Sequence, residues 1–283
     1  MKYPAIKYIV TSAVCVLLPA ASFAADDLVE PVPYEQAMTG SPVMGEIQGY
    51  FGTAILSSDG ESAYAHNYGA SAKVNFALTP NWNLQGDLFA QNLETSDDIF
   101  KTTGGAMHMY WRDPNSYALG AYVSLARYSI GGGANDLTSL LYGPEFQIYS
   151  GQYTFYGQGY FGDFRSNDAD GKVDMWGARG VVSYYFNDNL KWDNEVIYRH
   201  LGDSDDSVES WTGATQITYR IDGSPVSFFG RYEYAAFSGE DVSGRSQKVL
   251  AGIRFSLGGT TLREDERYGA AMDIGQVGNQ ALF

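Results

Sequence analysis

Apolar and polar residues alternate with a period of two along most of this chain, and that pattern limits its fold more than any other feature. Twelve segments carry the alternation, and Gly, Asn, Asp, Pro or Ser residues bound each of them. A period of two is typical of β-strands with two different faces. Each segment is also long enough for a tilted strand to cross a bilayer, which takes about 9 to 11 residues. The segments are Met44–Leu56, Tyr64–Leu78, Trp82–Gln91, Thr102–Trp111, Tyr117–Tyr128, Leu137–Tyr149, Gln152–Gly162, Val173–Phe186, Leu190–Leu201, Val208–Ile221, Val226–Phe237 and Ser246–Leu257.

The connections between these segments alternate in length. Short turns of standard turn chemistry, such as Thr79–Asn81 and Ser150–Gly151, alternate with longer links such as Ser57–Ala63 and Asn92–Lys101. Short turns at one end and longer links at the other describe an up-and-down antiparallel meander. The longer links also concentrate the acidic surplus of a chain with 33 Asp and Glu against 18 Lys and Arg.

Charged residues inside the segments separate the two faces of each predicted strand. In Leu190–Leu201, the charged residues Lys191, Asp193 and Glu195 share one face, and the other face is apolar. A soluble sheet would bury its apolar face in a core, whereas a membrane barrel would turn that face to lipid and the charged face to its lumen. The predicted lumen residues, which include one histidine, are Glu46, Lys73, Asp87, His108, Glu145, Arg179, Lys191, Asp193, Glu195, Arg199, Arg220, Arg231, Glu233, Lys248 and Arg254.

Large aromatic residues gather near the segment ends that the short turns join, and they share the apolar face. Such rings gain free energy at the level of the lipid headgroups, where one side is apolar and the other is wet. We therefore expect an aromatic girdle at the periplasmic rim of a barrel. Its predicted members are Trp82, Trp111, Tyr117, Tyr153, Phe186, Trp192, Tyr219 and Phe255.

The first residues have the pattern of a cleaved export signal. An apolar stretch at 9–18 follows two lysines, and Ser22 and Ala24 supply the small residues that a signal peptidase needs. Removal of residues 1–24 would also remove Cys15, the only cysteine. No later apolar run reaches the length of a transmembrane helix. The acidic balance of the chain argues against a nucleic-acid partner.

With these features the chain resembles bacterial outer-membrane β-barrels of the porin-like type over Met44–Leu257. The last segment adds to the resemblance, because the alternation in 252–257 is similar to the signal that the barrel-assembly machinery reads in a final strand. Leu250 departs from that signal, which has a polar residue there. The resemblance implies a bacterial outer-membrane location with both termini and the short turns in the periplasm. Outer-membrane lipid, lipopolysaccharide and the assembly machinery are the implied partners.

Four regions follow from these features. We expect a signal peptide at 1–24, a periplasmic N-terminal lead-in at 25–43 and an all-β, single up-and-down antiparallel transmembrane barrel of about 12 strands at 44–257. Longer acidic loops would face the cell exterior. The periplasmic tail at 258–283 hangs free, packs under the barrel or inserts as a plug.

Two functions fit a twelve-stranded barrel with a charged lumen. One is a narrow passive channel for small polar or charged solutes, because such a lumen is wider than that of eight strands and narrower than that of sixteen. The other is a non-conducting structural barrel whose lumen is filled by ion pairs. Matching residues by depth along the strands predicts four such pairs: Arg179 with Glu195, Asp193 with Arg220, Glu233 with Lys248 and Arg254 with Glu46.

A lipid-modifying barrel enzyme and a soluble secreted β protein are less favoured. His200 faces lipid by parity and is the candidate base for a lipid hydrolase, but no serine lies two residues away on its face. No catalytic set, cofactor motif or metal cluster stands out. The sequence does not indicate an oligomeric state.

Overall fold

The computed structural model describes residues 43–58, 61–131, 136–166, 172–202, 207–240 and 242–274. These residues form twelve strands and one helix. The expected signal peptide with Cys15, the expected lead-in up to residue 42, and residues 275–283 lie outside them. The strands are β1 (Val43–Ser58), β2 (Glu61–Ala77), β3 (Trp82–Glu94), β4 (Ile99–Asp113), β5 (Tyr117–Ile130), β6 (Leu137–Ser150), β7 (Tyr153–Ser166), β8 (Lys172–Asn187), β9 (Leu190–Gly202), β10 (Ser207–Arg220), β11 (Val226–Gly239) and β12 (Ser243–Leu257), and the helix is α3 (Leu262–Tyr268).

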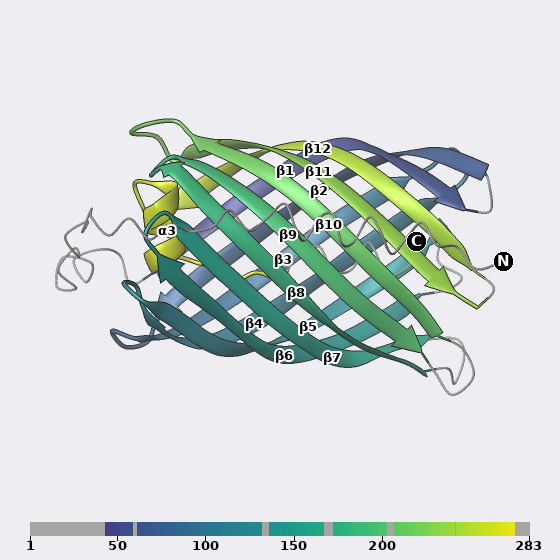
Figure 1. Cartoon of the computed structure of the whole chain (residues 1–283), viewed down its shortest axis with the longest axis horizontal. Coiled ribbons are helices and arrows are strands. Elements are labelled where there is room, and N and C mark those ends of the chain that lie inside the picture. The colour runs from purple at the N-terminus through teal and green to yellow at the C-terminus, as the bar shows by residue number, and fades with distance from the viewer. Residues whose placement is uncertain are drawn as a thin grey trace, which may run out of the picture. The chain divides into compact units, whose positions relative to one another are not determined.

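The twelve strands form one closed barrel (Figure 1). Each strand pairs antiparallel with its neighbours in sequence, and β1 pairs with β12 from Gly45 opposite Leu257 to Ser58 opposite Gly244. Closure leaves no unpaired sheet edge, which a strand structure must avoid in lipid. The predicted up-and-down barrel is confirmed. Among the described residues, no helix has the length and apolar character to cross a membrane.

The strands run further into the expected long links than the sequence predicted. Only residues 59 and 60 separate β1 from β2, and only residues 95–98 separate β3 from β4. Glu61 and Glu94, expected in links, therefore lie in strands. The reason is that a hairpin ladder continues wherever both chains stay extended, whatever the polarity of their side chains.

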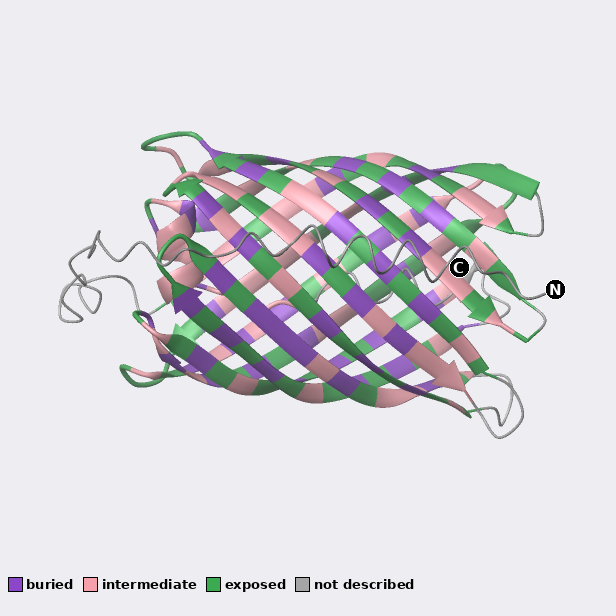
Figure 2. Ribbon diagram, in the orientation of Figure 1, coloured by how far each residue is buried: buried purple, intermediate pink, exposed green. Residues whose placement is uncertain are grey.

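The two ends of the barrel are named here by their connections. The turn end holds the links 78–81, 114–116, 151–152, 188–189 and 221–225, and the loop end holds the other links between strands. Buried and exposed residues alternate along the strands between these ends (Figure 2). In β8, for example, Met175 and Arg179 are buried whereas Trp176 and Val182 are exposed.

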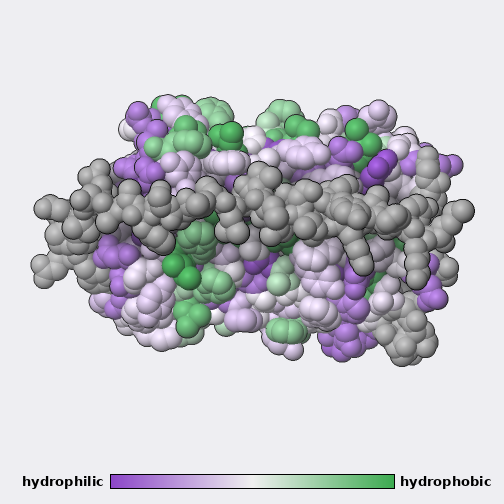
Figure 3. Space-filling model, viewed as in Figure 1, coloured by the Kyte–Doolittle hydropathy of each residue, from purple (hydrophilic) through white to green (hydrophobic). Residues whose placement is uncertain are grey.

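The exposed face of the barrel is rich in large apolar side chains. Phe51 is 70% exposed and Leu88 is 68% exposed. Figure 3 shows hydrophobic side chains on the outer wall between the ends, with hydrophilic side chains most frequent towards the two ends. An apolar surface of this extent is far larger than soluble proteins usually present to water, and it fits contact with lipid.

The eight predicted girdle residues all lie on this outer face near the turn end. Trp82 stands opposite Trp111 in the β3–β4 register, and the Trp111 ring packs 5.1 Å from that of Tyr117. Tyr153 packs 5.0 Å from Tyr184 on the next strand. Aromatic residues thus form a ring of outward contacts at one end, and its place in the periplasmic headgroup layer stays a prediction.

Candidate functional site: the barrel lumen

The chain folds back into the barrel after β12. Gly258 has φ +125°, a conformation that side-chain-bearing residues rarely adopt, and an added Cβ would lie 2.6 Å from Met44 Cγ. Helix α3 follows at once, and the Thr261 hydroxyl caps it by accepting a hydrogen bond from the Glu264 amide at 3.1 Å. A glycine reversal and a capped short helix therefore place the tail in the mouth of the turn end. We call residues 262–274 the plug.

Helix α3 is held by acidic side chains that reach different strands. Glu266 accepts hydrogen bonds from Thr154 and Tyr185, each at 2.7 Å, and pairs with Lys191 at 3.7 Å. On the other side, Asp265 pairs with Arg220 at 2.6 Å. These contacts join α3 to β7, β8, β9 and β10.

The residues after α3 run inside the barrel, where wall side chains donate to their main-chain carbonyls. Arg112 donates to the carbonyls of Tyr268 and Gly269 at 2.8 and 2.9 Å. Gln85 donates to that of Met272 at 2.8 Å. Of the three arrangements open to the tail from sequence, residues 262–274 show insertion into the lumen.

Three of the four predicted ion pairs are confirmed, and the fourth is wrong. Arg179 lies 2.5 Å from Glu195, Lys248 lies 3.3 Å from Glu233, and Arg254 lies 3.5 Å from Glu46. Arg220 instead binds Asp265 in the plug, and Gln216, not Arg220, stands opposite Asp193. The error has a physical cause, because Arg220 ends its strand and faces a helix that the strand pattern does not reveal.

A buried histidine bridges two carboxylates in the wall. His108 Nδ1 lies 2.9 Å from Glu145 Oε1, and His108 Nε2 lies 3.3 Å from Asp87 Oδ2. The imidazole stacks on the Tyr122 ring at a centroid distance of 5.6 Å. All three ionisable side chains have less than 4% of their surface exposed. Parity predicted these three residues in the lumen, and the structure adds that they form one cluster across β3, β4 and β6.

A second group of carboxylates and cations stands on β8, β9 and β11. Arg231 lies between Glu195 and Glu233, at 2.7 and 3.0 Å. Higher on β9, the guanidinium of Arg199 is fully buried and faces the phenol groups of Tyr128 and Tyr160. None of its nitrogens has an ion-pair partner among the described residues. The wall therefore carries alternating charge with a positive excess near the loop end of β9.

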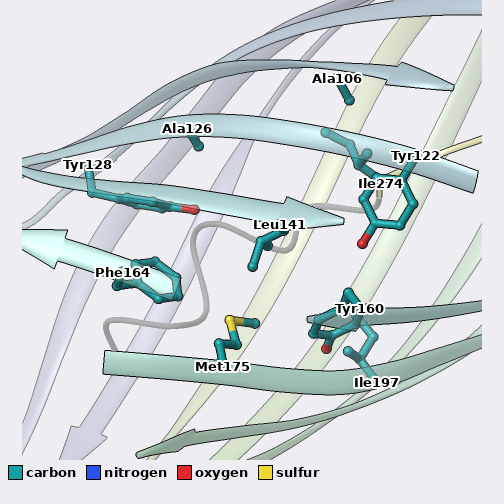
Figure 4. Close-up of a cluster of buried hydrophobic side chains, with 10 residues drawn as sticks. All are labelled: Ala106, Tyr122, Ala126, Tyr128, Leu141, Tyr160, Phe164, Met175, Ile197 and Ile274. Atoms are coloured by element: carbon teal, nitrogen blue, oxygen red, sulfur yellow. The ribbon is translucent and has the colours of Figure 1, made fainter. Parts of the chain in front are cut away.

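The loop-end half of the lumen is apolar on one side, which the sequence did not predict. Tyr128 packs 5.4 Å from Phe164, and Ile274 of the plug reaches the same cluster. Figure 4 shows these side chains pointing from the wall into the interior of the barrel. The cluster comprises Ala106, Tyr122, Ala126, Tyr128, Leu141, Tyr160, Phe164, Met175, Ile197 and Ile274.

A cavity of about 210 Å³ lies between the wall and the plug. Charged residues such as Lys73 and Glu46 line part of it, Tyr122 and Leu141 line another part, and Asp273 of the plug closes one side. A small solute would meet both polar and apolar contacts there. The plug segment that bounds the cavity is held mainly by side-chain contacts, with one main-chain hydrogen bond from the Arg263 amide to the Asp188 carbonyl at 3.2 Å.

Cations at the loop end partly neutralise the acidic rim. Arg165 pairs with Asp163 at 2.7 Å, and Arg127 donates to Asp136. The Arg127 guanidinium holds the pKa of the Asp136 carboxyl below its ordinary value. Among the described residues, no group of three or more His, Cys, Asp or Glu side chains is arranged to hold a metal ion.

The sequence matches no protein-family model, and no curated protein is significantly similar to it. Solved structures do match the barrel. An outer-membrane channel from Pseudomonas putida F1 matches with a TM-score of 0.55 and 12% identity, over 82% of this chain and 100% of that one. The translocator domain of the autotransporter NalP from Neisseria meningitidis matches with a TM-score of 0.51 and 12% identity, over 76% of this chain and 88% of that one. The fold is that of an outer-membrane β-barrel.

All fifteen predicted lumen residues of this outer-membrane barrel are buried or half-buried. The structure brings fourteen of them into ion pairs, including those of the histidine, and leaves Arg199 apart. Whether they line a conducting pore stays a prediction.

Several residues that hold the plug were missed. The sequence prediction placed Arg112 in a turn, but β4 continues to Asp113 and Arg112 is buried. Arg112 lies four residues after His108 in β4 and therefore points to the same side of the strand. This shared parity could have identified Arg112 as a lumen residue. Gln85 shares parity with Asp87 in the same way, but it carries no charge and so was not counted.

Among the described residues, no nucleophile stands opposite His200 in the barrel. His200 lies at the outer face, where its ring packs 5.4 Å from Trp176. The residues opposite it in the two neighbouring strands are Trp176 and Glu209. A serine for a lipid hydrolase is at neither position.

Proposed function

We propose that this barrel is a narrow passive outer-membrane channel for small polar or charged solutes, and that the plug closes it. The observation that carries the proposal is the way the lumen is filled. Among the described residues, the plug joins no strand, and wall side chains hold its carbonyls and carboxylates. One main-chain hydrogen bond, from the Arg263 amide to the Asp188 carbonyl at 3.2 Å, also fastens α3 to the link between β8 and β9. A segment held in this way can leave the lumen without breaking the barrel.

The wall supports the charged or polar solute class. Arg179 and Arg231 alternate with Glu195 and Glu233 across three strands that line or adjoin the cavity. Charges of both signs along a lumen wall polarise a passage and orient a charged solute within it. The apolar cluster on the other side narrows the path near the loop end.

The orientation in the membrane is part of the same proposal. The turn end, with its outward aromatic residues, would face the periplasm, as would both termini. The outer wall would contact lipid, and acidic residues at the loop end would meet lipopolysaccharide through divalent cations. The barrel-assembly machinery would read the end of β12.

Solute efflux from proteoliposomes tests the proposal. The wild type is compared with the full-length variant Leu262→Ala/Glu266→Ala, called the loosened variant, which removes the buried leucine of α3 and its carboxylate bonds to three strands. We expect efflux of small sugars and amino acids to be slow for the wild type and much faster for the loosened variant. Equally slow efflux for both folded proteins would overturn the proposal.

A second candidate is a non-conducting structural barrel, which the buried ion pairs favour. Pairs such as Arg179–Glu195 and Lys248–Glu233 have side chains less than 7% exposed. Close pairing of this kind satisfies charges that could not stay ionised alone. Folded wild-type and loosened barrels that both let no solute pass would support this candidate.

A further inference from the structure

The wall of the lumen binds the main chain of residues 268–273 through many side-chain donors. Five of the six carbonyl groups from Tyr268 to Asp273 accept hydrogen bonds from wall side chains, with that of Ala270 as the exception. The donors come from six strands: Lys73, Gln85, Tyr110, Arg112, Gln147, Tyr156, Gln158 and Arg179. We call them the donor row.

One member of the donor row pairs with the peptide group in both directions. Gln85 Nε2 donates to the Met272 carbonyl at 2.8 Å, and the Met272 amide donates to Gln85 Oε1 at 3.2 Å. A side-chain amide that pairs with both groups of one residue imitates a neighbouring β-strand. Main-chain pairing of this kind gives affinity for an extended chain whatever its side chains are.

The side chains of residues 269–271 add little, whereas that of Met272 is fully buried among Tyr110, Ala118 and Tyr156. Residues 269–271 are Gly, Ala and Ala, and neither alanine is fully buried. Asp273 uses its carboxylate for Lys73 and Arg179 at 3.6 and 3.4 Å, but its carbonyl receives three further donors. The donors are therefore placed for a backbone, and the adjoining cavity of about 210 Å³ has room for small side chains.

We propose that the donor row is a binding site for the extended main chain of short peptides with small side chains, and that the plug occupies it as a built-in ligand. The proposal rests on the proposed channel in one respect, since it names short peptides as a solute class of that channel. A free peptide would compete with residues 268–273 for the same donors.

Fluorescence anisotropy tests the binding step without requiring conduction. The probe is an uncharged, dye-labelled hexapeptide of glycine and alanine, added to the full-length loosened variant in detergent micelles. We expect saturable binding at least about tenfold tighter than to the wild type, because the resident plug competes less well. A dye-labelled polyether of equal length, which lacks amide groups, should not bind.

Two substitutions on the same strand show whether the donor row is responsible. In the loosened variant, Gln85→Leu should weaken peptide binding about tenfold, since two hydrogen bonds are lost. Gln91→Leu is the matched control, because Gln91 is also a buried glutamine of β3 but bonds to Tyr50. If Gln85→Leu fails to show the gel mobility of a folded barrel, Gln147→Leu replaces it, because Gln147 donates to the Ala271 carbonyl at 3.1 Å.

The outcomes separate the two proposals. A folded loosened variant that conducts but binds no peptide overturns the donor row as a peptide site and leaves the channel standing. Peptide binding without conduction overturns the channel and supports the site. Equal losses from Gln85→Leu and Gln91→Leu would also overturn the donor row, since a general change in the lumen would then explain both.

Discussion

Glu266 of the plug accepts a hydrogen bond from the Tyr185 hydroxyl of β8 at 2.7 Å. The same carboxylate accepts from Thr154 of β7 at 2.7 Å and lies 3.7 Å from Lys191 of β9. One side chain thus fastens α3 to three adjacent strands. Among the described residues, no other carboxylate of the helix contacts as many strands.

Glu266→Ala should release the plug. Each hydrogen bond to a charged group contributes about 1.5–3 kcal/mol, so the docked plug loses several kcal/mol relative to the open state. The measurement is the rate at which a thiol reagent labels the cysteine of a Met272→Cys background. Met272 is fully buried while the plug is docked, so labelling requires the plug to leave its place. We expect labelling to accelerate at least about tenfold.

Glu264→Gln is the control for that experiment. Among the described residues, the Glu264 carboxylate bonds only to the amide and hydroxyl of Thr260, just before the helix. Its amide analogue should leave the labelling rate close to that of the Met272→Cys parent. Equal rates for Glu266→Ala and Glu264→Gln would show that the Tyr185 contact does not hold the plug.

His108→Leu should destabilise the barrel strongly. The substitution leaves the Asp87 and Glu145 carboxylates buried without the ring that bridges them, and such a loss costs about 3–5 kcal/mol. Urea unfolding in lipid vesicles measures the change in free energy of unfolding. His66→Leu, at an exposed position of β2, should change it by less than about 0.5 kcal/mol. A small effect of His108→Leu would mean that the cluster is not a charged bridge.

Gly252→Val should lower stability through a clash inside the lumen. An added Cβ at Gly252 meets the Phe229 ring, whereas at the exposed Gly180 it meets nothing within 4 Å. Overpacking of this kind costs about 1–3 kcal/mol. Gly180→Val is therefore the matched control in the same urea titration. Comparable losses for the two variants would argue against a packed Phe229.

Arg231→Gln should shift ion preference towards cations. Arg231 is the cation between Glu195 and Glu233, so its removal leaves their charge less compensated in the wall. In the loosened variant, the reversal potential under a salt gradient should move in the cation-selective direction. Arg245→Gln removes the same charge from an exposed position of β12 and should leave it unchanged. Identical shifts of the reversal potential for Arg231→Gln and Arg245→Gln would show that the change does not depend on the place of Arg231 in the lumen.

Much of the barrel was predictable because strand parity is a local property. Charges that alternate with apolar residues, as in Lys191, Asp193 and Glu195, face the lumen as predicted. The pair Arg179–Glu195 followed from depth alone because both residues lie near the middle of adjacent strands. Errors in the predicted strand register are small near the middle of a strand, because each strand of a closed barrel pairs with a fixed neighbour on both sides.

The plug was not predictable by the same means. Residues 268–273 bind mainly through main-chain carbonyls, which every sequence has, so no residue type marks them. The carboxylates of Asp265 and Glu266 lie after the last strand segment, where strand parity gives no partner for them. Arg220 was assigned to Asp193 because the strand pattern contains no information on α3. The apolar lumen cluster was missed for a related reason: Tyr128 and Phe164 lie on β5 and β7, which carry none of the predicted lumen charges, and only the closed wall shows that the two side chains converge.

Single-channel recording in planar bilayers tests the central claim, closure of the lumen by residues 262–274, most directly. Wild type, Glu264→Gln and the loosened variant are recorded at equal protein content after gel mobility shows each to be folded. We predict rare, brief openings for the first two and long-lived open states for the loosened variant. Sustained conductance of the wild type equal to that of the loosened variant would contradict a closing role for the plug.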